Sequence, residues 1–132
     1  MHYLFISHSW AYGDAYEKIV KMLDGHKYFE WHDYSIPKDD PIHNVGTDKE
    51  LEEAIRNKII HVNCVLILAG VYSTYSKWIN KEIKIANELG KPIVAVQPWG
   101  AERTSQIVKD NAVEIVGWNS GSIVNAIREH SI

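Results

Sequence analysis

A glutamate in a helix-like segment is the strongest candidate for chemistry in this sequence. Glu82 follows Trp78 by four residues, so the two side chains would share one face of a helix. A carboxyl group beside an aromatic ring in a cleft is partly desolvated. Desolvation would raise its pKa and suit it to act as an acid, a base or an acceptor for ribose hydroxyls. The alternative is an exposed glutamate that pairs with Lys81 or Lys84 on a charged helix face.

Small polar and aromatic residues follow the first apolar segment of the chain. Ser7, His8, Ser9 and Trp10 stand where a first strand would end. Small polar groups at such a place can hydrogen-bond a phosphate or a ribose. No glycine-rich phosphate loop accompanies them. We predict that Ser7, His8 and Trp10 bind the substrate, and the alternative is an ordinary turn between strand and helix.

Three further candidates leave the second strand-like segment at the same edge. Asp33, Tyr34 and Ser35 could contact a nucleotide, or could simply begin a loop. Trp78 adds a ring that could stack on a base, although packing at the rim of the core would explain it equally well. We count all four among the predicted substrate-binding residues.

Short apolar runs alternate with helix-like segments, which is typical of stacked βαβ units. The run 64–69 is apolar throughout, as in a strand that is buried on both faces of a parallel sheet. The irregular stretch 33–47 is longer than a routine connection, and loops of this length are often functional. The expected strands are 3–7, 29–32, 64–69, 93–96 and 112–116, and the expected helices are 14–23, 48–61, 76–89, 105–109 and 121–129.

Five strands joined by right-handed crossovers favour the order 2-1-3-4-5. We therefore expect one α/β domain over residues 1–132. Its fold would be flavodoxin-like, a doubly wound five-stranded parallel sheet with helices on both faces. The connections after strands 1 and 3 then leave in opposite directions, and ligands bind at the carboxyl ends of those strands. The candidate residues all lie in segments that reach this crevice.

Charge and composition exclude several classes of protein. Lys plus Arg number 14 and Asp plus Glu number 17, for a net charge of −3. This balance argues against a protein that binds nucleic acid or a membrane surface. The lone Cys64 cannot form an internal disulfide, which suits a reducing, cytoplasmic location. The seven histidines show no metal-ligand spacing, so we expect neither a metal site nor a resident cofactor.

Two segments resemble signature regions of TIR domains. The run 3–9, Tyr-Leu-Phe-Ile-Ser-His-Ser, is similar to the first box of that family. The run 78–83, followed by Gly-Lys-Pro-Ile-Val-Ala-Val at 90–96, is similar to the segment that holds the TIR catalytic glutamate and the strand after it. Over nearly its whole length, the chain resembles bacterial TIR-like domains of the Thoeris antiphage defence system (ThsB type).

This resemblance implies an activity and a set of partners. TIR enzymes cleave the nicotinamide–ribose bond of NAD, and Thoeris members make cyclic ADP-ribose signals that activate an effector protein. By the same resemblance, Glu82 would be the catalytic glutamate, Phe5, Ser7 and His8 would form one edge of the pocket, and 33–43 would be a gating or assembly loop. The implied partners are NAD as substrate, the effector, a phage-derived trigger and further copies of the chain.

Two other functions stay open at this point. Nucleoside deoxyribosyltransferases share the fold, a glutamate nucleophile on a helix and a similar Gly-Lys-Pro-Ile strand. They would consume a deoxynucleoside in place of NAD. A TIR-type interaction module would bind partners through its surface, and Glu82 would then be dispensable.

Overall fold

The computed structural model describes residues 1–7, 15–35, 48–69, 72–97 and 105–132. Its five strands form one parallel sheet in the order β2-β1-β3-β4-β5, which confirms the predicted fold class and strand order. The strands are β1 (His2–Ile6), β2 (Trp31–Asp33), β3 (Cys64–Leu68), β4 (Ile93–Gln97) and β5 (Glu114–Gly117). The helices are α1 (Ala15–Gly25), α2 (Asp48–Ile59), α3 (Tyr72–Glu88), α4 (Gln106–Asn111) and α5 (Ser120–His130).

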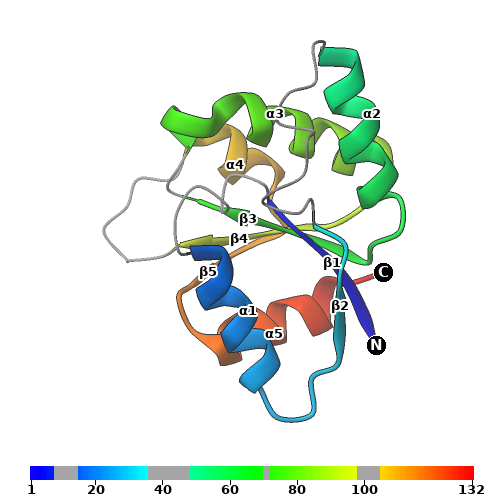
Figure 1. Cartoon of the computed structure of the whole chain (residues 1–132). Coiled ribbons are helices and arrows are strands. Elements are labelled where there is room, and N and C mark those ends of the chain that lie inside the picture. The colour runs from blue at the N-terminus through cyan, green and yellow to red at the C-terminus, as the bar shows by residue number, and fades with distance from the viewer. Residues whose placement is uncertain (8–14, 36–47, 70–71, 98–104) are drawn as a thin grey trace.

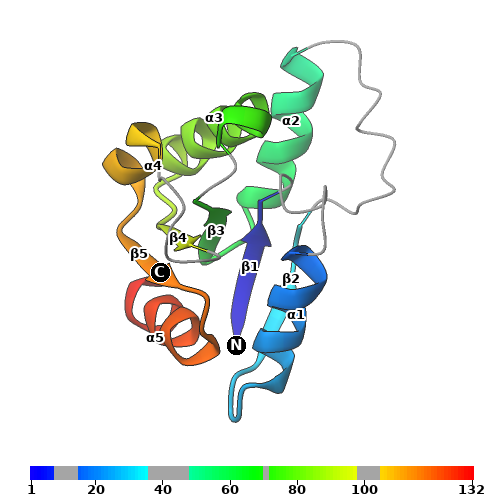
Figure 2. The same ribbon diagram turned by 90° about the vertical axis from the view of Figure 1, so that its left-hand side faces the viewer.

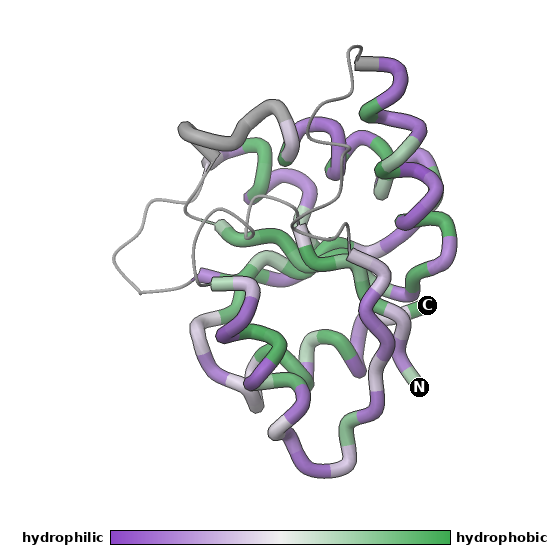
Figure 3. Tube along the Cα trace, in the orientation of Figure 1, coloured by the Kyte–Doolittle hydropathy of each residue, from purple (hydrophilic) through white to green (hydrophobic). Residues whose placement is uncertain are grey.

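Helices cover both faces of the sheet. In Figure 1, α2, α3 and α4 lie on one side of the strands and α1 and α5 on the other, and the view in Figure 2 agrees. All five residues of β3 are buried, because a parallel strand in the middle of such a sheet has helices on both sides. The central strands accordingly form the most hydrophobic part of the trace in Figure 3. The edge strands β2 and β5 are shorter and partly exposed.

The two faces of the sheet carry separate cores. Along β1, Leu4 and Ile6 belong to the core under α1 and α5, whereas Phe5 belongs to the core under α2 and α3. Successive side chains of a strand point to opposite faces. Ser7, which follows β1, therefore points to the same face as Phe5, toward α3.

Helix α3 positions the candidate glutamate, and its start differs from the prediction. The helix begins at Tyr72 and not at 76, so Glu82 lies well inside it and not in its second turn. Residues 72–75 are Tyr-Ser-Thr-Tyr, whose weak helix propensities concealed the first turn. The ends of the other elements differ from the prediction by no more than two residues.

The end of α3 lies within one residue of the predicted helix 76–89, just before Gly90. Gly90 has a φ of 69°, which a residue without a Cβ adopts at little cost. Its N–H donates to the carbonyl of Asn87, and the N–H of Lys91 donates to the carbonyl of Ala86. This is the Schellman pattern of hydrogen bonds, which turns the chain from α3 into β4.

Two further features concern the parts of the chain outside the sheet. Of the predicted long loop 33–47, residues 36–47 lie outside the described residues. Among the residues that are described, none of the helices combines the length and the apolar character needed to cross a membrane.

Candidate functional site

Ser7 and Glu82 meet in the interior, at the carboxyl end of β1. The Ser7 hydroxyl donates a hydrogen bond to Glu82 Oε1 at 2.5 Å. Ser7 is 1% exposed and Glu82 0%, and they are the two buried polar side chains among the described residues. An O–H···O contact of this length falls in the range of charge-assisted hydrogen bonds to a carboxylate. The structure thus brings together two of the predicted site residues.

The sheet and α3 hold this pair from both sides. The backbone N–H of Ser7 donates to the carbonyl of Leu66 at 2.8 Å, which fixes the end of β1 against β3. Glu82 lies among the inward-facing residues of α3, next to the buried Ile83 and one turn after the buried Ile79. Because strand and helix are both anchored in the same core, the carboxyl group has a defined position.

The alternative interpretation of Glu82 as an exposed surface glutamate is wrong. Lys81 and Lys84 reach across to Glu52 on α2 instead, at 3.3 and 3.4 Å. Hydrogen bonds from Lys81 and Lys84 lower the pKa of the Glu52 carboxyl from its ordinary value. Lys81 and Lys84 thus pair with α2, and Glu82 lies on the inner side of α3.

A second network ties the end of β2 to β1. Asp33 Oδ1 accepts the N–H of Ser35 at 2.8 Å, an Asx turn that leads the chain out of β2. Ser35 Oγ then accepts the N–H of Ile6 at 2.8 Å. A serine side chain therefore replaces the strand partner that Ile6 lacks once β2 has ended. Asp33 and Ser35 thus lie at the predicted edge of the sheet, where their side chains bond to Ser35, Tyr16 and Ile6.

Tyr16 completes this network, although it is not among the residues predicted for the site. Tyr16 lies at the start of α1, and its hydroxyl donates a hydrogen bond to Asp33 Oδ2 at the end of β2. Burial, together with the hydrogen bond to Asp33 and the charge of that residue, raises the pKa of Tyr16 above its usual range, so the phenol stays a donor. Tyr16 belongs to an apolar stripe of α1, together with the buried Ile19 and Leu23. The sequence feature that could have indicated this role is a tyrosine in the first turn of the helix that follows β1, where its hydroxyl can reach the edge of the sheet.

The remaining predicted residues have different surroundings. Tyr34 packs its ring against Tyr3 and His61, at centroid distances of 5.6 and 5.8 Å, so it belongs to the packing of the sheet. Phe5 is fully buried in the core beneath α3, and half-buried Trp78 packs against that core one turn before Glu82. His8 and Trp10 lie outside the described residues. The role of all these residues in substrate binding stays a prediction.

A comparison with protein families supplies the decisive observation. Residues 5–103 match the family described as "Thoeris protein ThsB, TIR-like domain". The chain belongs to this family. The matched stretch of the ThsB-type domain includes Phe5, Ser7 and Glu82, so both partners of the buried hydrogen bond lie inside it. A search of curated protein sequences finds no match to the chain.

Solved structures show the same architecture in another protein. A CMP N-glycosidase of Clostridium botulinum, BcmB, superposes with a TM-score of 0.57 at 13% sequence identity. The match covers 96% of this ThsB-type domain and 98% of the glycosidase chain. At this identity the likeness establishes a shared fold over nearly all of both chains.

Proposed function

We propose that this ThsB-type domain cleaves the bond between nicotinamide and ribose in NAD, with Glu82 as the catalytic residue. The observation that carries the proposal is the buried Glu82 carboxyl group, which Ser7 holds at the carboxyl end of a central strand. Ligands of doubly wound sheets bind at this edge, beside the strand where the connections diverge. Membership of a TIR-like family supports NAD as the substrate.

One carboxylate is enough for this reaction. The nicotinamide ring of NAD carries a positive charge, so it departs as a neutral molecule without being protonated. Ordinary glycosidases, by contrast, need a general acid to protonate their leaving group. The bond between the nicotinamide nitrogen and ribose C1′ breaks, and its electron pair returns to that nitrogen. Positive charge then develops on the ribose. In the proposal, Glu82 binds the ribose hydroxyls and stabilises this charge in a site of low dielectric constant.

The fate of the ribose cation decides the product. Attack on C1′ by water, with loss of a proton from that water, would give ADP-ribose. Attack on C1′ by a hydroxyl of the same ADP-ribose, with loss of its proton, would give a cyclic product. Exclusion of water and close placement of the internal hydroxyl favour the second outcome. We assign the exclusion of water to Trp78, which is half-buried one turn before Glu82.

The remaining partners in the proposal follow from the family. The cyclic product would be a diffusible signal that activates a separate effector protein, and a phage-derived component would trigger its synthesis in the cytoplasm. NAD is consumed as substrate, so the proposal includes no resident cofactor for this reaction.

A second candidate substrate is a nucleoside or nucleotide. The glycosidase of the same fold is named for CMP, whose base is also joined to ribose through an N-glycosidic bond. A cytosine base is a poorer leaving group than nicotinamide, because it carries no positive charge. This candidate would therefore need a proton donor in addition to Glu82.

The test offers NAD, CMP and a deoxynucleoside to lysates that contain the protein and an effective trigger, and it follows release of each base. We expect nicotinamide release by the wild type and a loss of about 100-fold or more in Glu82→Gln. The matched control is Glu88→Gln, because Glu88 lies on the same helix but pairs with Arg56 at the surface. Loss of CMP or the deoxynucleoside, with NAD untouched, would contradict the proposal, as would a folded and fully active Glu82→Gln.

A further inference from the structure

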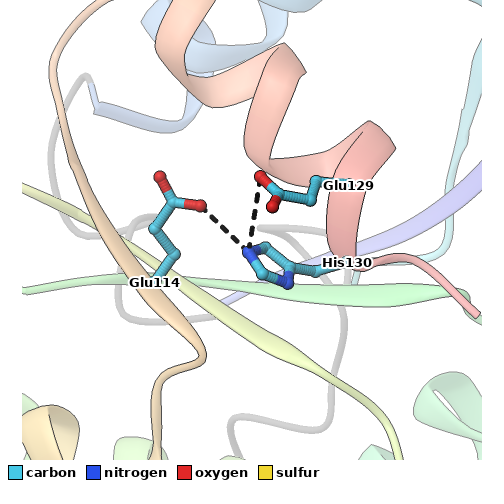
Figure 4. Close-up of side chains that lie close together, drawn as sticks. All are labelled: Glu114, Glu129 and His130. Atoms are coloured by element: carbon cyan, nitrogen blue, oxygen red, sulfur yellow. Dashed lines mark hydrogen bonds and ion pairs between the residues drawn. The ribbon is translucent and has the colours of Figure 1, made fainter.

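Three potential metal ligands meet on the face of the sheet opposite to Glu82. Glu114 lies on β5, and Glu129 and His130 end α5. His130 Nε2 is 2.9 Å from Glu114 Oε1 and 3.9 Å from Glu129 Oε2. One ligand atom from each residue lies within 4.8 Å of the other two. Figure 4 shows the three side chains pointing toward one another across the gap between strand and helix.

The electrostatics of this place favour a cation. Two carboxylates lie close together, and each would be stabilised by positive charge between them. Glu129 stands in the last turn of α5, where the helix dipole disfavours a negative charge. The imidazole of His130 adds a nitrogen ligand atom beside the two carboxylates. The exposed fractions of the His130, Glu114 and Glu129 side chains are 26%, 39% and 71%, so an ion can enter from solvent.

We propose that Glu114, Glu129 and His130 form a binding site for a divalent transition-metal ion of the zinc class. One imidazole nitrogen and two carboxylate oxygens are ligands that Zn²⁺ accepts, and a water molecule would complete a tetrahedral shell. Ca²⁺ and Mg²⁺ prefer six or more oxygen ligands and gain nothing from the imidazole. The sequence shows no ligand motif here, because Glu114 and His130 are brought together only by the fold.

A metal ion at this site would join the edge strand to the last helix. Glu114 pairs with Val94 of β4, whose side chain belongs to the core under α1 and α5. The cluster therefore lies on the α5 side of the sheet, whereas Ser7 and Glu82 lie on the α3 side. The bound ion would stabilise the fold and would not touch the reaction site, so this inference and the proposed function can fail independently.

The test measures Zn²⁺ binding by calorimetry and the melting temperature with Zn²⁺ or Mg²⁺, using the whole chain. The control is His61→Ala, since His61 is exposed and belongs to no such cluster among the described residues. We expect Zn²⁺ to raise the melting temperature of the wild type and the control, and Mg²⁺ to leave it unchanged. His130→Ala and Glu129→Gln should each weaken Zn²⁺ binding by about tenfold or more.

Glu129→Gln keeps the test decisive if His130→Ala fails to fold, because most of the Glu129 side chain is exposed. Equal Zn²⁺ affinity in the wild type and in a folded variant would overturn the proposal. An unchanged melting temperature at saturating Zn²⁺ would do the same, and the cluster would then be an ion pair only.

Discussion

Ser7 donates its hydroxyl hydrogen to Glu82 Oε1 at 2.5 Å, across 75 positions of the sequence. The bond joins the end of β1 to the inner face of α3. A buried carboxyl group is costly to fold unless it is hydrogen-bonded, so this contact contributes to stability. It also orients the carboxyl group, because the backbone of Ser7 is itself bonded to Leu66 on β3. Ser7 is therefore a positioning residue for Glu82 in the proposed reaction.

Removing the Ser7 hydroxyl should lower activity without removing the catalytic group. In Ser7→Ala, Glu82 loses a hydrogen bond that is worth about 1.5–3 kcal/mol for a charged acceptor. We expect kcat to fall by about tenfold to 100-fold, with a smaller change in KM. Steady-state kinetics with NAD under triggered conditions provide the measurement.

The conservative variant separates positioning from packing. Ser7→Thr keeps a hydroxyl on the same atom, and a β-branched residue suits an extended backbone. We expect Ser7→Thr to recover most of the kcat that Ser7→Ala loses. If Ser7→Ala is folded and as active as the wild type, the hydrogen bond has no part in the reaction.

The hydrogen bond from the Ile6 N–H to Ser35 Oγ should protect the end of β1 from local opening. In Ser35→Ala, the buried N–H of Ile6 loses its acceptor at Oγ, at a cost of about 1–3 kcal/mol. We expect faster hydrogen exchange at the Ile6 amide and a lower free energy of unfolding, whereas Ser35→Thr should preserve both. Unchanged exchange at Ile6 in Ser35→Ala would show that another group takes over the bond.

The lone cysteine should be unreactive in the folded protein. Cys64 is buried in β3, and burial raises the pKa of its thiol from 9.0 to about 12. The folded chain then keeps a proton that the unfolded chain releases above pH 9. The free energy of unfolding should consequently fall as pH rises from 9 toward 12. Alkylation at pH 8 should be slow in buffer and fast in denaturant.

Cys64→Ala provides the control for that pH dependence. The variant lacks the thiol, so its free energy of unfolding should fall less steeply than that of the wild type above pH 9. Other groups that titrate in this range, including Tyr16, are common to both proteins and cancel in the comparison. Parallel curves for the two proteins would contradict the assignment.

The fold could be predicted because its determinants are local. The apolar run at 64–69 indicates a doubly buried strand, and Gly90 marks a helix end by its own conformational freedom. The start of α3 could not be predicted from residues 72–75. Their weak helix propensity is overridden by packing of the helix on the core, which only the tertiary structure supplies.

The candidate site could be predicted only in outline. Strand order places Ser7, Asp33 and Glu82 near one edge of the sheet, but no spacing rule joins Ser7 to a glutamate 75 positions away. Side-chain direction was also inaccessible to sequence patterns. Ser35 points back to Ile6, and Tyr34 packs against Tyr3, because the Asx turn at Asp33 ends β2.

The most direct test of the central claim is the nucleotide content of phage-infected cells that express the wild type, Glu82→Gln or Glu88→Gln at equal levels. The proposal predicts that NAD falls, and that a product with the mass of cyclic ADP-ribose appears, in the wild type and in Glu88→Gln but not in Glu82→Gln. Identical nucleotide profiles in all three strains, with an effective trigger present, would contradict it and would favour a domain that acts through protein contacts alone.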